Sequence, residues 1–208
     1  MLDSTAQKWQ FWILWVLASA AAGAAVALVA RAAAYSVGYS VGGAEGTVAG
    51  EAALGVVALG GFMGVIAIAQ WLVMLKLVPW SGRWVLANAA GGALCGAVML
   101  SLFAALTPIT GETVAAFTGV PVGLAAFGLT LWLTLRRRVA WAGRLAVAGV
   151  VGLIAAGPLG AGAIGALFGG ELGAGAGFGG IYAAVTGGAL LIFGKAAASP
   201  PVSQPSTI

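Results

Sequence analysis

Three acidic residues stand at equivalent places in a chain that is otherwise poor in charge. Each follows a glycine and precedes a long apolar run, in the pairs Gly50-Glu51, Gly111-Glu112 and Gly170-Glu171. A carboxylate in the first turn of a helix is stabilised by the positive end of the helix dipole and accepts from free backbone N–H groups. The alternative is that Glu51, Glu112 and Glu171 form a ring at the outer mouth of a bundle, where three carboxylates would attract cations.

Two amides are the strongest polar side chains inside the apolar runs. Gln70 lies just before Lys76 and Asn88 lies just after Arg83, so we expect both amides at matching depth on neighbouring antiparallel helices. A buried amide needs a hydrogen-bonding partner, and Gln70 and Asn88 are therefore predicted to form an interhelical clamp. The alternative is that they bind a ligand head group or weakly ligate a metal.

The chain lacks the residue types on which most enzyme active sites depend. The chain has no histidine, and Cys95 is its single cysteine. The commonest general base, the usual haem or zinc ligand and any Cys-x-x-Cys pair are therefore absent from the sequence. We expect a protein that is not an enzyme, with no catalytic residues, no metal site and no required cofactor, although a bound lipid, pigment or quinone stays open.

One dense basic cluster stands out, formed by Arg136, Arg137, Arg138 and Arg144. It either sets the orientation of the chain in a membrane, or also holds an anionic lipid or an acidic partner at the cytoplasmic face. The net charge of +4 does not indicate nucleic acid, because the basic residues form short groups between apolar runs and not a basic face.

Composition identifies the solvent of this chain as lipid. Of 208 residues, 62% are hydrophobic and 7% are charged, and the mean hydropathy is +1.08. Soluble domains carry roughly 25% charged residues. The 35 glycines lie among Ala, Leu and Val, a mixture that lets helices approach closely in a bilayer.

An apolar stretch of about 20 residues spans a bilayer as an α-helix. The sequence predicts an all-α integral membrane bundle of six transmembrane helices, at roughly 9–30, 52–75, 84–106, 113–135, 144–168 and 173–194. The connection 32–50 is either a helical extension or a loop, and Pro121 and Pro158 are expected to kink their helices.

Charge predicts the orientation of these six helices. With a cytoplasmic N-terminus, every basic residue except Arg31 falls on the cytoplasmic side, as the positive-inside rule requires. We therefore expect a multi-pass protein of the bacterial cytoplasmic (inner) membrane with both termini in the cytoplasm. The first apolar run resembles a cleavable signal, but it matches a later internal helix and is interpreted as a retained span.

All eight tryptophans belong to the same predicted side of the membrane. They are interpreted as an aromatic belt of interfacial anchors. The alternative is a platform for a pigment, a quinone or a partner subunit. The residues are Trp9, Trp12, Trp15, Trp71, Trp80, Trp84, Trp132 and Trp141.

An internal repeat organises the chain into helical hairpins. The segment 15–24 returns as 84–93 with eight of ten positions identical, and Trp71, Trp80 and Trp141 belong to a second recurring block. Three hairpin repeats follow, at about 9–75, 84–135 and 144–194. They form one transmembrane domain, 1–198, followed by a polar Pro/Ser tail, 199–208, and closure into a pseudo-threefold bundle is left open.

The segment Gln70-Trp71-Leu72-Val73, followed by Trp84-Val85-Leu86-Ala87-Asn88 among glycine-rich helices, resembles a group of uncharacterised bacterial polytopic membrane proteins with QWLVLR and WVLAN hairpins. The resemblance covers most of residues 55–145. This chain departs from it by continuing Met74-Leu75-Lys76 in place of Leu-Arg. The resemblance implies the topology and no activity.

These features favour a non-enzymatic accessory or scaffold subunit of a larger membrane complex, energy-converting in the respiratory or photosynthetic sense. Its expected partners are the lipid bilayer and other membrane subunits. The alternative is a small channel or facilitator for a neutral or cationic solute, with the three glutamates at its mouth.

Overall fold

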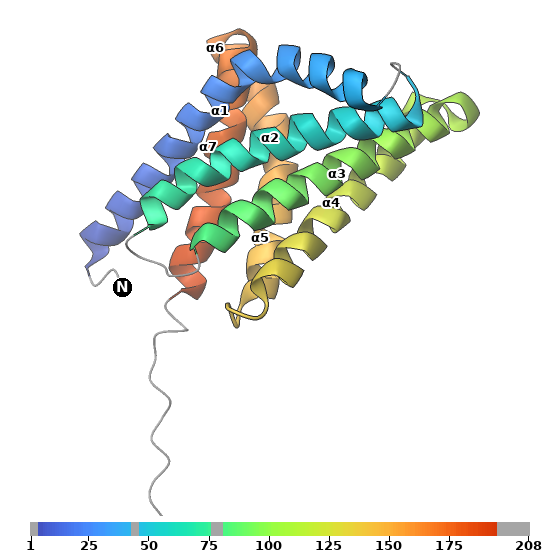
Figure 1. Cartoon of the computed structure of the whole chain (residues 1–208). Helices are drawn as coiled ribbons and strands as arrows, with labels where there is room; N and C mark the ends of the chain where they lie inside the picture. The colour runs from blue at the N-terminus through green and yellow to red at the C-terminus, as the bar shows by residue number, and fades with distance from the viewer. Residues whose placement is uncertain (1–3, 43–45, 76–80, 195–208) are drawn as a thin grey trace, which may run out of the picture.

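The protein is an all-α membrane bundle, as a computed structural model shows for residues 4–42, 46–75 and 81–194 (Figure 1). Six of the helices in these ranges are long and apolar enough to cross a membrane, which confirms the predicted spans. Trp80 and the tail 199–208 lie outside the described residues. The elements are α1 (Thr5–Gly42), α2 (Val48–Met74), α3 (Ser81–Thr110), α4 (Glu112–Leu135), α5 (Ala142–Ala155), the π-helical η1 (Ala156–Ile164), α6 (Gly165–Phe168) and α7 (Gly170–Phe193).

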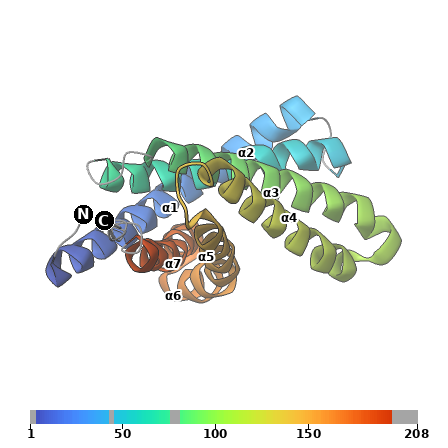
Figure 2. The same cartoon turned by 90° about the horizontal axis from the view of Figure 1, so that it is seen from below.

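The helices pack in chain order, and the last returns to the first. Each long helix contacts the next one along the chain, and α7 contacts α1, so the spans form a closed circuit (Figures 1 and 2). Successive spans run in opposite directions. We call the end that carries Lys8, Arg83 and the arginines 136–138 the basic end, and the end that carries Glu51, Glu112 and Glu171 the acidic end.

The first helix is longer than a single span. Its membrane-spanning part is Thr5–Leu28, but the helix continues to Gly42. Figure 1 shows this continuation bending away and running across the acidic end of the bundle. Of the two alternatives for residues 32–50, the helical extension therefore holds as far as Gly42.

The fifth span changes its hydrogen-bonding pattern in its middle. Residues 156–164 form a π-helix, which contains Pro158, between the α-helical segments α5 and α6. Proline has no N–H to donate to the preceding turn, and wider turns are one way in which a helix absorbs such a break. Pro121, by contrast, lies inside the unbroken helix α4.

Glycine contacts bring several pairs of helices to backbone distance. A Cβ atom added at Gly96 of α3 would meet the backbone of Gly55 on α2, and one added at Gly23 of α1 would meet the backbone of Gly175 on α7. Since lipid provides no hydrophobic drive for helices to associate, this close packing is a main source of their attraction. A Cβ atom added at Gly160 of η1 would likewise meet the backbone of α7.

We expect Gly96→Ala to lower the free energy of unfolding by about 1–3 kcal/mol, because the new methyl group must push α2 and α3 apart. Gly61→Ala is the matched control, since a Cβ there meets nothing within 4 Å. Reversible unfolding in mixed detergent and denaturing micelles measures both variants. Equal stability of the two variants would show that the α2–α3 contact is less tight than the structure has it.

Candidate functional site

A continuous chain of hydrogen bonds runs through the interior of the bundle, in the half nearer the basic end, and joins four helices. On one side, Gln70 of α2 donates from Nε2 to Ser19 Oγ of α1 over 3.0 Å. The Gln70 Oε1 atom accepts from the indole N–H of Trp84 on α3 over 2.7 Å. Gln70 is fully buried, so its amide links α1 to α3 inside the protein.

Asn88 makes the second link, from α3 to α7. Its Oδ1 atom accepts from the hydroxyl of Tyr182 over 2.5 Å, while its Nδ2 donates to the backbone carbonyl of Trp84 over 2.9 Å. Asn88 and Tyr182 are both fully buried. The amides of Gln70 and Asn88 are thus both bonded to Trp84, one to its ring and one to its backbone.

The chain of hydrogen bonds returns from α7 to α1. Thr186 Oγ1 donates to the carbonyl of Tyr182 over 2.9 Å and accepts from the indole N–H of Trp15 over 3.4 Å. Ser19 Oγ in turn donates to the carbonyl of Trp15 over 2.7 Å. We call these seven residues the polar ring; they are Trp15, Ser19, Gln70, Trp84, Asn88, Tyr182 and Thr186.

The polar ring leaves no buried side-chain donor or acceptor unpaired within the described residues. In lipid, an unpaired polar group costs several kcal/mol, since no water can replace the missing partner. The structure therefore places Gln70 and Asn88 in contacts that hold four helices together. In this arrangement their hydrogen-bonding groups are directed at protein atoms.

Sequence reasoning missed five of the seven members of the polar ring. Ser19 had a signal, because it is the counterpart of Asn88 in the repeated segment, and each of the two side chains donates to the carbonyl four residues earlier. Tyr182 and Thr186 also stand four residues apart, on one face of a helix that is apolar after its first turn. The spacing predicts a shared face, but the partner helix depends on the tertiary packing.

The interpretation of the tryptophans as an interfacial belt is wrong for two of them. Trp15 and Trp84 are fully buried, and their ring centroids lie 5.9 Å apart in the core. Each indole N–H finds an acceptor on a neighbouring helix, so these rings are satisfied away from the interface. Trp9 and Trp132 are exposed, with Trp12, Trp71 and Trp141 partly buried, and these five lie near the basic end.

The three glutamates begin their helices as the sequence predicts, but they do not share one local role. Glu51 Oε1 accepts from the backbone N–H of Gly46 over 3.2 Å, beside the N-cap Thr47 of α2. Gly111 and Gly170 have positive φ angles of 81° and 60°, whereas Gly50 is helical. The glycine of each pair therefore makes a turn in only two of the three places.

The structure does not gather the three glutamates into one cluster. Among the described residues, no group of three acidic, histidine or cysteine side chains is placed to hold a metal ion. In both overall views, α7 begins beside α6, away from the first turns of α2 and α4 (Figures 1 and 2). Glu171, but neither Glu51 nor Glu112, borders the cavity described below.

The basic cluster lies on the surface between α4 and α5. Arg136, Arg137 and Arg138 form the turn after α4, and all three are exposed. The guanidinium of Arg136 lies 4.9 Å from the ring centre of Trp132, and that of Arg144 lies 5.3 Å from the ring centre of Phe193. These cation–π contacts fix the side chains at the basic end, where lipid phosphates or acidic partners would meet them.

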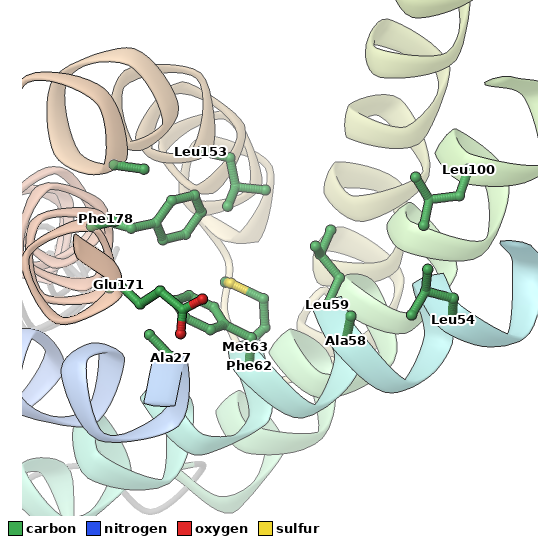
Figure 3. Close-up of a pocket in the computed structure, with 13 residues that line it drawn as sticks. Ala27, Leu54, Ala58, Leu59, Phe62, Met63, Leu100, Leu153, Glu171 and Phe178 are labelled. Atoms are coloured by element: carbon green, nitrogen blue, oxygen red, sulfur yellow. The ribbon is translucent and has the colours of Figure 1, made fainter. Parts of the chain in front are cut away.

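A cavity of about 440 Å³ opens in the half of the bundle nearer the acidic end (Figure 3). Side chains of α2 and α3, including Leu59 and Leu100, form one wall, and Phe178 of α7 with Leu153 of α5 forms the facing wall. Among the described residues of this lining, Glu171 is the polar side chain. Met63 belongs both to the cavity and to the buried core.

Three comparisons with known proteins found no similar protein. No protein-family model, no curated protein and no solved structure matches this chain.

We expect Gln70→Leu to lower the free energy of unfolding by about 1–2 kcal/mol, because it leaves the buried indole N–H of Trp84 without an acceptor. Leucine is close in volume and stands at the corresponding repeat position, Leu131. A double-mutant cycle with Trp84→Phe, measured by unfolding in micelles, should give a coupling of about 1 kcal/mol.

Thr118→Val is the control for this experiment, since the Thr118 hydroxyl is exposed and bonds only within α4, to the carbonyl of Val114. We expect it to change stability little. Additive effects of Gln70→Leu and Trp84→Phe would contradict the bond between these two side chains.

Proposed function

We propose that this multi-pass membrane protein is a non-enzymatic accessory or scaffold subunit of a larger complex, energy-converting in the respiratory or photosynthetic sense. The observation that carries the proposal is the polar ring. Buried polar side chains are the groups that would be expected to carry out chemistry or to conduct a solute. In this protein they form hydrogen bonds that join one helix to another.

The packing around the polar ring favours a rigid structural element over a conduit. Large side chains fill the space between the helices at the same level, among them Phe127, Leu131 and Leu145, which are fully buried. On α2 and α7, the ring residues Gln70 and Tyr182 follow the cavity residues Met63 and Phe178 toward the basic end. A solute that entered the cavity would therefore meet this filled layer next.

The α3–α4 hairpin offers a surface for a neighbouring subunit. Ile109 and Phe117, near its tip, are 80% and 79% exposed. Figure 2 shows the hairpin reaching away from α5 and α7. Such a projecting apolar face contacts either lipid or another membrane protein, and a scaffold would use it for the second.

The channel or facilitator remains the second candidate, and the cavity beside Glu171 is the observation that favours it. It requires the filled layer at the polar ring to open. Purified protein in liposomes would then accelerate the flux of a neutral or cationic solute, and Glu171→Gln would reduce that flux.

We expect a photo-reactive benzoylphenylalanine at position 117 to cross-link one membrane protein that also copurifies in fixed stoichiometry with the tagged chain in mild detergent. The same group at Val147 of α5, which is 64% exposed, is the control face and should give lipid adducts. Mass spectrometry identifies the adducts. Lipid adducts alone at both positions, with a chain that purifies by itself, would contradict the accessory role and direct the work to flux assays.

We further propose that the basic end faces the cytoplasm of a bacterial inner membrane, because the exposed arginines gather there. A cysteine at position 137 should react with a membrane-impermeant maleimide in inside-out vesicles and not in intact cells. The native Cys95 is buried and gives a low background. Labelling of position 137 in intact cells would reverse the orientation.

A further inference from the structure

The cavity near the acidic end has the chemistry of a binding site for a hydrocarbon chain. Of the 13 described residues that line it, all except Glu171 present apolar atoms or backbone (Figure 3). Its volume of about 440 Å³ falls in the range of roughly 300–1,000 Å³ that is usual for ligand sites. It opens between helices long and apolar enough to span a membrane, and the medium beside such helices is the acyl chains of lipids.

Its shape follows from the helix packing described above. The glycine contacts draw α1 to α7 and α2 to α3, and the cavity lies between these two pairs. Phe62 and Phe178 meet edge to face across the two pairs, with ring centroids 5.2 Å apart. This aromatic contact closes the cavity on the side of the core, where Met63 is 1% exposed.

The lining discriminates among apolar ligands. The carbonyl groups of a quinone would need side-chain N–H or O–H donors, and the described lining has none. A hydrated solute would need several polar groups to replace its water. A saturated chain needs only dispersion contacts, which every lining residue supplies except the Glu171 carboxylate.

We propose that this cavity binds one acyl chain of a membrane lipid from the leaflet at the acidic end, with the lipid head group beside Glu171. Lipid tails gain no hydrophobic free energy on leaving the bilayer, so the chain is held because it fills a space that would otherwise forfeit packing contacts. Water gains little in such a space, since apolar walls offer it no partners.

Glu171 at the rim favours a head group that donates hydrogen bonds. The residue lies in the first turn of α7 and its carboxylate borders the cavity. A carboxylate only accepts hydrogen bonds, and its two oxygens accept several at once. The Glu171 carboxylate can therefore accept from a lipid head group in addition to a partner within the protein. The primary ammonium of phosphatidylethanolamine offers this carboxylate both a positive charge and hydrogen bonds, whereas phosphatidylglycerol offers only neutral hydroxyl donors and carries a net negative charge.

The test uses the full-length protein in vesicles of phosphatidylethanolamine and phosphatidylglycerol that contain a phosphatidylethanolamine with a diazirine at the end of its acyl chain. After illumination, peptide mass spectrometry should place the main adducts on the cavity segments 54–63 and 153–178. Adducts spread evenly over the lipid-facing residues of all helices would overturn the site.

A matched pair of variants tests whether the acyl chain lies in the cavity. Ala58→Phe adds a ring to the cavity wall, and Val56→Phe adds the same ring at a position of α2 that is exposed to lipid. We expect adducts at the cavity segments to fall about tenfold in Ala58→Phe, which corresponds to about 1.4 kcal/mol of lost affinity, and to persist in Val56→Phe. Equal adduct yields in both variants would overturn the proposal.

Native mass spectrometry of the unmodified chain gives a measurement that does not depend on how well Ala58→Phe folds. One phosphatidylethanolamine should remain bound after detergent exchange, and Glu171→Gln should retain one lipid but lose the preference over phosphatidylglycerol. A protein that retains no bound lipid would overturn the proposed site. An unchanged preference in Glu171→Gln would overturn the role of the carboxylate. Neither result depends on whether partner subunits exist.

Discussion

The polar ring is the interaction on which the rest of this bundle depends. Lipid supplies no hydrogen bonds, so each polar side chain inside the bundle must find its partner in the protein. Here Gln70 and Asn88 reach different helices, and the ring returns from α7 to α1 through Thr186 and Trp15. The bonds between helices limit the relative depth and rotation of the helices that they join. Separation of any one of these helices would leave a buried donor or acceptor without its partner.

Two kinds of packing divide the bundle along the membrane normal. Near the basic end, large side chains such as Trp15, Trp84 and Tyr182 fill the space between helices and carry the polar ring. Toward the acidic end, glycines bring α1 to α7 and α2 to α3, and these two pairs separate around an apolar cavity. A closed half joined to an open half suits a structural subunit that carries a lipid better than it suits a pore.

The repeated segments of the sequence are used for different purposes. Trp15 and Trp84 occupy the same place in their repeats and both are buried, but the first donates to a hydroxyl of α7 and the second to an amide of α2. One repeat further along the chain, Leu131 stands in the place of Gln70 and Gly149 stands in the place of Asn88. The hydrogen bonds of the polar ring therefore join α1, α2, α3 and α7, and apolar packing takes their place at α4 and α5.

Much of the architecture could be predicted from the sequence alone, because the length and apolar character of each run determine whether a helix spans a bilayer. The six spans, their helical class and the glutamates in first turns follow from such local properties. Only the tertiary structure decided that Trp15 and Trp84 are buried, that Gln70 meets Ser19, and that Glu171 borders a cavity while Glu112 does not. These outcomes depend on how helices rotate and cross. Rotation and crossing are governed by contacts between residues far apart in the chain, and hydropathy and charge do not report those contacts.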